Sequence, residues 1–194
     1  MKGFFSLFTS SAKEFKSVRT ICVTGLLIAV SMMLESVTIE IPNAKINFAY
    51  LAIAAIGMLY GPTVSFFSGA LCDLVGYIAH PDGGFLPAYI IPAMLQGLIY
   101  GVFLYRAQPK RASFYIRVIA ARLLDVLVIN LCLNTLLNIH YGFLVAETVA
   151  AGIWMRVVKN LIQFCADVPI SIAVLTAVSV AYLQVQRFSS RAKV

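Results

Sequence analysis

One long apolar stretch, residues 46–105, most constrains how this chain of 194 residues can fold. Turn-forming residues interrupt the stretch at Gly61-Pro62 and again at Pro81-Asp82-Gly83-Gly84, which leaves three pieces of about 16 to 20 residues each. A helix of that length, rising 1.5 Å per residue, is about long enough to cross a hydrocarbon core of roughly 30 Å. The stretch therefore predicts three consecutive membrane-spanning helices.

Small residues recur at helical spacing in the second and third of these pieces. They are Ser65, Gly69, Cys72 and Gly76 in the second piece, and Ala93, Gly97 and Gly101 in the third. Lipid tails are as apolar as leucine, so membrane helices associate through close backbone packing, which small residues permit. We therefore predict that these two helices form a tightly packed hairpin.

The composition of the whole chain is that of a membrane protein. Hydrophobic residues make up 61% and charged residues 12% of it, and the mean hydropathy is +0.90. A chain of this length leaves room for about six spans and for no separate soluble domain. We predict an all-α integral membrane protein, a six-transmembrane-helix bundle. The four cysteines lie in apolar runs without metal-ligand spacing, which predicts small buried side chains.

Basic residues at both ends mark off the membrane domain. Residues 1–19 are predicted to form a basic amphipathic segment on the inner leaflet, residues 20–185 the membrane domain and residues 186–194 a basic tail. The N-terminal segment, the connection after the fourth span and the tail hold eleven of the fifteen Lys and Arg residues. Because basic residues favour the inner side, both termini are predicted to be cytoplasmic.

The last predicted helix, over about residues 153–184, carries candidate binding residues. At about 48 Å it is longer than the membrane core is thick. One polar face of it, near the outer surface, consists of Arg156, Lys159, Asn160, Gln163 and Asp167. The two cations can snorkel to lipid headgroups. Alternatively, the face lines a cavity between helices, where the cations attract a ligand with carboxylates that Arg can grip bidentately.

A second group of candidate binding residues is expected at the same outer level. It consists of Asn47, Phe48 and Tyr50 at the start of the second span, and Phe85 and Tyr89 near the start of the fourth. Such aromatic residues can form an interfacial belt. If they converge with the two cations, they make a slot for a flat ring with an anionic tail.

Several polar residues fall within predicted spans and need partners there. Asp73 in the third span is expensive unless it finds one. Arg122 and Asp125 stand three residues apart in the fifth span and can pair on one face. A second polar face of the fifth span consists of Asn130, Asn134 and Asn138.

The sequence contains no recognisable catalytic constellation. The two histidines, His80 and His140, stand 60 residues apart without metal-ligand spacing, and no paired-Asp motif is present. A nucleophile elbow and a Walker motif are also missing from the sequence. We predict that the chain is not an enzyme and takes no cofactor, metal or nucleic acid. Uphill transport would then need an external motor or an ion gradient.

Several short motifs, in their order along residues 20–185, resemble the substrate-binding (S) components of energy-coupling factor (ECF) vitamin transporters, and most of all the folate-type group. They are GMLYGP, SGALCDLVGY, a Pro-x-Gly-Gly loop, LQGLIYGVFLY, LLNT and MRVVKN. The resemblance implies six helices in a bacterial plasma membrane and a substrate cavity that opens outward. It also implies a complex with one membrane coupling subunit and two ATPase subunits.

The resemblance also implies a docking face and a vitamin ligand. Family members carry a small-xxx-small motif, usually two alanines, on the first helix, and Gly25 and Ala29 stand there in this chain. The family's loop usually reads Pro-x-Gly-Pro-aromatic-Pro-Gly-Phe, from which Gly84-Phe85-Leu86-Pro87-Ala88-Tyr89 departs. We expect folate first, with pantothenate and cobalamin as alternatives. A stand-alone secondary carrier or a structural membrane bundle is the alternative from another class.

Overall fold

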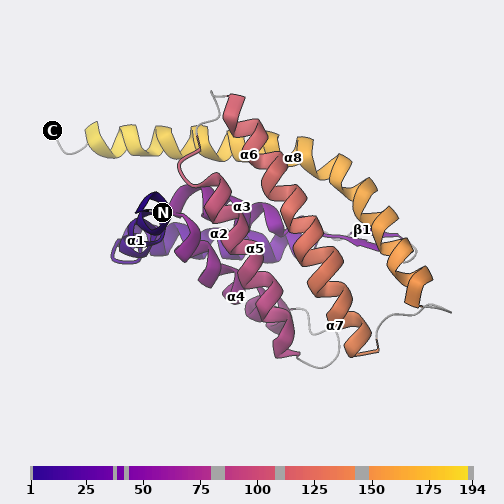
Figure 1. The fold of residues 1–194 in the computed structure, drawn as a ribbon. Helices are drawn as coiled ribbons and strands as arrows, with labels where there is room; N and C mark the ends of the chain where they lie inside the picture. Colours follow the sequence, from indigo (N-terminus) through magenta and orange to yellow (C-terminus); the bar gives the residue numbers. More distant parts are fainter. Residues whose placement is uncertain are drawn as a thin grey trace.

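A computed structural model describes residues 2–36, 39–41, 44–79, 86–107, 112–142 and 149–191 of the chain. They form a bundle of helices, with α1 and the end of α8 at the left of Figure 1 and β1 at the right. The elements in chain order are α1 (Lys2–Glu14), α2 (Val18–Ser36), β1 (Ile39–Ile41), β2 (Ala44–Ile46), α3 (Tyr50–Tyr60), α4 (Pro62–Ala79), η1 (Pro87–Tyr89), α5 (Ile90–Leu104), α6 (Ala112–Leu124), the π-helix η2 (Asp125–Leu133), α7 (Asn134–His140) and α8 (Val149–Arg191).

Four helices in the described ranges are long and apolar enough to cross a membrane. They are Val18–Ser36, Pro62–Ala79, Pro87–Leu104 and Ile153–Val185. The apolar helix α3 has only 11 residues, and a π-helix divides the helical run from α6 to α7. The predicted helical membrane bundle is confirmed, whereas the predicted number of six spans is not. Two three-residue antiparallel strands, β1 and β2, add a small hairpin that the all-α prediction did not include.

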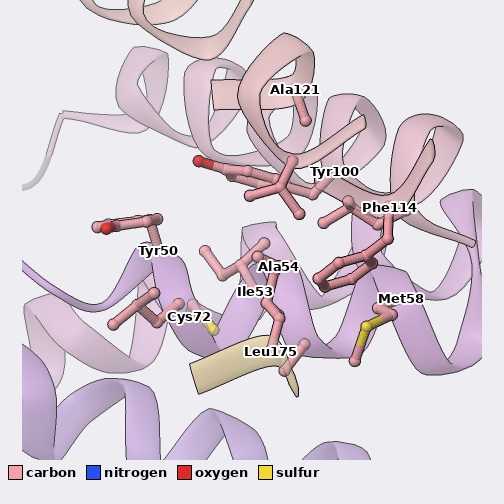
Figure 2. Packing of buried hydrophobic residues seen from close by; sticks show 13 residues of the cluster. Tyr50, Ile53, Ala54, Met58, Cys72, Tyr100, Phe114, Ala121 and Leu175 are labelled. Carbon is pink, nitrogen blue, oxygen red and sulfur yellow. The ribbon is translucent and has the colours of Figure 1, made fainter. Parts of the chain in front are cut away.

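Helix α3 lies at the centre of the bundle. Ten of its 11 residues are buried, so neighbouring helices surround it on all sides. Its side chains belong to one cluster with buried residues of four other helices, which include Cys72, Tyr100, Phe114 and Leu175, as Figure 2 shows. The short α3 is therefore the core around which the longer helices are arranged.

Helices α4 and α5 pack so closely that their glycines cannot be enlarged. A Cβ atom built on Gly97 would lie 2.6 Å from the carbonyl carbon of Ser65. One built on Gly69 would lie 2.8 Å from the carbonyl carbon of Ala93. The Ser65 hydroxyl also donates to the Gly97 carbonyl oxygen at 2.7 Å. The predicted tight hairpin of these two helices is confirmed.

The turn between α3 and α4 is held by α1. Gly61 adopts a φ of +87°, a left-handed conformation that favours glycine. The buried hydroxyl of Ser11 donates to the Tyr60 carbonyl oxygen at 2.7 Å and accepts from the backbone N–H groups of Thr63 at 3.0 Å and Val64 at 3.2 Å. Those N–H groups have no partner within α4 itself, so α1 caps this helix from outside.

Helix α8 is longer than the predicted last span. It covers 43 residues, which corresponds to about 65 Å, and contains Pro169. It extends to Arg191, so the first part of the predicted tail at 186–194 is helical. The three predicted domain boundaries stay predictions. Toward the end of α8, the guanidinium of Arg19 lies 5.2 Å from the centroid of the Tyr182 ring. This contact joins the start of α2 to the last part of α8.

The cysteines differ from their prediction. Cys72 is buried, but Cys22, Cys132 and Cys165 are exposed on the surface of the bundle. The prediction of burial is wrong for these three, because an apolar residue in a membrane helix can face lipid as readily as protein.

Candidate functional site

A cavity of about 230 Å³ lies among the helices, in the half of the bundle away from α1. Residues of α2, α3, α4, α5, α6, η2 and α8 line it, together with the segment just before α3. At the opposite end of the bundle, α1 packs against the turn between α3 and α4, and the residues there do not line the cavity. The hollow half of the bundle is therefore the candidate binding site.

One wall of the cavity carries carboxylates. Glu35 near the end of α2 and Asp73 on α4 both line it and are half-buried. The Glu35 carboxylate lies directly over Gly76, where a Cβ atom would come within 2.5 Å of its Oε2. The small residue on α4 thus makes room for the acidic side chain of α2.

A second wall comes from α8 and carries a cation. Lys159 and Gln163 stand four residues apart, so they lie one above the other on one helix face. Both side chains line the cavity and are half-buried. The two walls therefore present opposite charges to whatever enters.

Behind the cavity lies a buried charged network centred on Arg122. Its guanidinium forms ion pairs with Asp125, at 2.5 Å, and with Asp167 of α8. The Gln96 amide donates to Asp125 Oδ1 at 3.0 Å. The predicted pairing of Arg122 with Asp125 is confirmed. Because Gln96 and Arg122 also line the cavity, the network reaches the site itself.

Two tyrosine rings pack around this guanidinium. Arg122 Cζ lies 4.0 Å from the centroid of the Tyr50 ring, a cation–π contact, and its Nη1 donates to the Tyr100 hydroxyl at 3.2 Å. The rings of Tyr50 and Tyr100 stack with centroids 6.3 Å apart, and both are visible in Figure 2. Removing Arg122 would leave the buried carboxylates of Asp125 and Asp167 without their ion-pair partner, which is strongly destabilising. The network thus connects α3, α5, α6, η2 and α8.

The π-helix η2 decides which side chains of its helix face inward. Its last turn closes with a bond from the Asn134 N–H to the Ile129 carbonyl, five residues back. In an α-helix, residues five apart point about 140° away from each other, and a wider π turn reduces that angle. Asp125 can therefore join the network while Asn130 lines the cavity. Asn134 and Asn138, from the same predicted polar face, do not line it.

Four of the nine predicted binding residues lie around the cavity. They are Asn47, Tyr50, Lys159 and Gln163. Asn47 also has a local task, because its Oδ1 accepts from the Ala49 N–H at 2.6 Å just before α3 begins.

Two predicted aromatic residues lie apart from the cavity, and a third cannot be placed. Phe48 packs against the hydrophobic core. Tyr89 stacks on Tyr141, with ring centroids 6.3 Å apart. Phe85 lies outside the described residues.

The remaining two predicted residues belong to α8 and do not line the cavity either. Asn160 is buried and donates to the Arg156 carbonyl at 2.8 Å, within its own helix. Arg156 is half-buried, and its guanidinium donates to the Thr135 hydroxyl at 3.4 Å. It stands one turn before Lys159 on the same helix.

Sequence reasoning missed several residues of the site. Glu35, Asp73, Gln96, Arg122 and Asn130 all line the cavity but were not predicted to bind a ligand. A usable signal was present, because each is a polar residue inside an apolar span, where such residues face the interior of a bundle.

The family model for the ECF transporter, substrate-specific component, matches residues 19–182 of the chain. The chain belongs to this family. It is therefore a multi-pass membrane protein and a component of a transporter, not an enzyme, and the resemblance noted in its motifs is confirmed.

Individual relatives of this S component are folate transporters. Folate transporter FolT of Clostridium novyi (strain NT) is 32% identical over 127 residues, which are 66% of this chain and 70% of that protein. Folate transporter FolT of Leuconostoc mesenteroides subsp. mesenteroides is 28% identical over 173 residues, 88% of this chain and 92% of that protein. A crystal structure of FolT bound with folic acid matches with a TM-score of 0.66 at 30% identity, and covers 82% of this chain and 91% of its own.

Proposed function

We propose that this S component binds a vitamin, folate first, from outside the cell and delivers it through an ATPase-driven complex. The main observation in favour of this proposal is the cavity, which is lined by Lys159 and Gln163 of α8 together with Tyr50 and Asn47 at the start of α3. Folate has a flat ring at one end and a glutamate with two carboxylates at the other. The relatives described above, which are folate transporters, favour the same vitamin.

Lys159 and Arg156 hold the carboxylates of the ligand. Lys159 lines the cavity and is half-buried, which weighs against simple snorkelling to lipid headgroups. Arg156 lies one turn before Lys159 on α8, and its guanidinium donates to the Thr135 hydroxyl. The cavity of about 230 Å³ is smaller than the roughly 300–1,000 Å³ of sites for drug-sized ligands, so it encloses one end of folate. The rest of the molecule extends along α8 toward Arg156, where Asn160 and Tyr89 are further candidate contacts.

Calorimetry with the purified protein tests the choice of ligand. Folate, pantothenate, riboflavin, thiamine, biotin and cobalamin are compared, and folate is expected to bind most tightly. If pantothenate or cobalamin binds more tightly, the alternative ligand is correct. If none binds with a Kd below millimolar, the protein is not a receptor for any of these vitamins.

Substitution of the two cations tests the carboxylate clamp. A charge-assisted hydrogen bond in a partly desolvated site contributes about 1.5–3 kcal/mol, so Arg156→Ala or Lys159→Ala should weaken folate binding about 10- to 150-fold. Arg156→Lys should recover only part of the loss, because an ammonium cannot make the bidentate pair. Lys16→Ala, at an exposed position near α1, is the control and should leave the affinity unchanged. Affinities of the Arg156→Ala and Lys159→Ala proteins within twofold of the parent would instead favour snorkelling.

The same proposal includes six crossings with both termini in the cytoplasm. The short, fully enclosed α3 and the helical run from α6 to α7 add two crossings to the four long apolar helices. The exposed cations Lys13 and Lys16 lie at the α1 end of the bundle. Arg106 lies there too, because its N–H donates to the Met58 carbonyl at 3.2 Å. A concentration of cations at one end favours placing that end inside the cell.

We also assign Gly25 and Ala29 to docking with a membrane coupling subunit. Both are exposed on α2, and a Cβ atom on Gly25 would meet nothing within 4 Å. Two ATPase subunits complete the complex and supply the energy that the chain itself cannot. Co-purification from the native membrane with a coupling subunit and two ATPase chains is the expected result. Uptake of folate by the chain alone, in vesicles without ATP, would favour the stand-alone carrier.

A further inference from the structure

Asp73 is a carboxylate within a membrane-spanning helix, and it has no partner among the residues that the structure describes. It lies on α4, lines the cavity and is half-buried. Within the described ranges it makes no hydrogen bond or ion pair with another residue. By contrast, the fully buried Asp125 and Asp167 both pair with Arg122. A carboxylate at that depth is costly when it is unpaired, so the carboxylate of Asp73 lacks a partner that a ligand can supply.

Three other groups of the cavity wall do not act as that partner. The Ser31 hydroxyl already donates to the Ala49 carbonyl oxygen at 3.4 Å. Glu35 carries charge of the same sign. Lys159, the cation of the α8 wall, is not within ion-pair distance of Asp73. The carboxylates that line the cavity, on α2 and α4, are therefore separate from Lys159 on α8.

We propose that Asp73 accepts two hydrogen bonds from a ring edge of the ligand that carries two adjacent N–H donors. This rests on the proposed function, since the ring is then the pterin of folate. Its 2-amino-4-oxopyrimidine edge presents a ring N–H and an exocyclic amino group side by side. The two oxygens of a carboxylate can accept both hydrogens at once, in the fork geometry that makes bidentate bonds strong.

The charge layout of the cavity then orients the ligand. The ring edge, which donates hydrogen bonds, lies against Asp73 on the α4 wall of the cavity, and the glutamate tail leaves along the α8 wall, past Lys159 toward Arg156. In the reverse orientation, carboxylates would face Glu35 and Asp73, and like charges facing each other oppose binding. Asp73 is thus a specificity-determining residue for the ring, and Lys159 acts on the other end of the molecule.

A comparison of two ring ligands tests this on the unmodified protein. The probes are 6-methylpterin and 6-methyllumazine, which compete with labelled folate. Lumazine has a carbonyl oxygen in place of the 2-amino group, so one of the two donors becomes an acceptor that faces the carboxylate. A site built around a hydrogen bond strongly rejects an analogue that cannot make it. We expect 6-methylpterin to compete at least about 10 times better, and equal competition by both rings would overturn the assignment.

Substitution of Asp73 provides the second arm of the test. Asp73→Asn keeps the shape of the side chain but offers one acceptor and one donor, which matches lumazine rather than pterin. The affinity for folate should fall about 10- to 150-fold, and the preference for pterin over lumazine should disappear or reverse. Competition by p-aminobenzoyl-L-glutamate, which lacks the ring, should stay within twofold. Lys159→Ala should show the opposite pattern, with the loss confined to the ligands that carry carboxylates.

Glu35→Gln is the matched control, because it removes one negative charge from the same wall. It should retain the preference for pterin. If Glu35→Gln abolishes that preference, or Asp73→Asn leaves it intact, Asp73 does not read the ring edge. If Asp73→Asn fails to fold, the comparison of the two rings on the parent protein decides.

Failure of the folate assignment can be told apart from failure of this inference. A parent protein that binds 6-methylpterin through Asp73 but does not bind folate would refute only the choice of vitamin. One that binds folate without any preference for pterin over lumazine would refute only the role of Asp73. Binding of neither folate nor 6-methylpterin would overturn both.

Discussion

Two helices of this S component carry small residues four positions apart, and they use them in opposite ways. On α5, Gly97 and Gly101 press into α4, and a Cβ atom on Gly97 would lie 2.6 Å from the Ser65 carbonyl carbon. On α2, Gly25 and Ala29 are exposed, and a Cβ atom on Gly25 would meet nothing within 4 Å. The same spacing therefore forms a tight helix–helix contact between α5 and α4, which we call the closed contact. On α2 it leaves an exposed surface at Gly25 and Ala29, which we call the open face.

The difference arises from which side of each helix the protein occupies. The buried residues of α2 are Thr20, Thr24 and Ser31, so its polar side faces the bundle and its small apolar side faces outward. The small residues by themselves do not reveal this, because lipid and protein interior are equally apolar environments. An open small face on a membrane helix indicates the place of a partner helix, which supports the docking role proposed for Gly25 and Ala29.

The largest effect is expected at the closed contact. Gly97→Leu should destabilise the protein by at least about 3 kcal/mol, because the new side chain would overlap the backbone of α4 and neither helix can move away. Thermal unfolding and size-exclusion chromatography in detergent measure this. Gly25→Leu, at the open face, is the control and should leave the protein folded. A Gly97→Leu protein with an unchanged Tm would mean that α4 and α5 are not packed as described.

The next prediction concerns a double substitution at the open face, which should prevent assembly with the coupling subunit without affecting folding. Gly25→Leu combined with Ala29→Leu should abolish co-purification with the coupling subunit, since bulky side chains hold a partner helix away. The affinity for folate should stay within twofold of the parent, because neither residue lines the cavity. Assembly of the double variant with its partners would show that docking uses another surface.

The closed contact could be predicted from the sequence because everything it needs is local. The turn at Gly61-Pro62, the small residues and the helical spacing all lie in one continuous stretch. The third predicted span ends near residue 80, and α4 ends at Ala79. Predicting helices in such a stretch requires only length and turn chemistry, and their contact follows from the size of the residues.

The cavity could be predicted only in part, because its members come from distant parts of the chain. The polar side of α8 was visible in the sequence, and Lys159 and Gln163 do line the cavity. The bond between Arg122 and Asp167 joins residues 45 positions apart, and no local pattern indicates it. Nor does the apolar run Asp125–Leu133 show that it forms a π-helix, which decides that Asn130 faces inward.

A smaller effect is expected from the hydrogen bond that crosses the closed contact. Ser65→Ala removes the donor to the Gly97 carbonyl and should destabilise the protein by about 0.6–1.7 kcal/mol, the range for such bonds between membrane helices. Ala29→Ser, which adds a hydroxyl at the open face, is the matched control and should change the stability little. Equal stability of Ser65→Ala and the parent would mean that the hydroxyl bonds within α4, where it also lies 2.9 Å from the Gly61 carbonyl oxygen.

The smallest predicted change in stability has opposite signs at the open face of α2 and at the closed contact of α5. Gly25→Ala should stabilise the protein by about 0.5–1 kcal/mol, because alanine restricts the unfolded chain and its methyl group meets no neighbour on α2. Gly97→Ala should destabilise it, since even one methyl group there would overlap the Ser65 carbonyl. Chemical unfolding of the two variants side by side measures both signs. A coupling subunit should still dock on the Gly25→Ala protein, which then carries two alanines on this face. If Gly25→Ala destabilised the isolated protein as much as Gly97→Ala, the face of α2 would already be covered without a partner, and the contrast between the two helices would not exist.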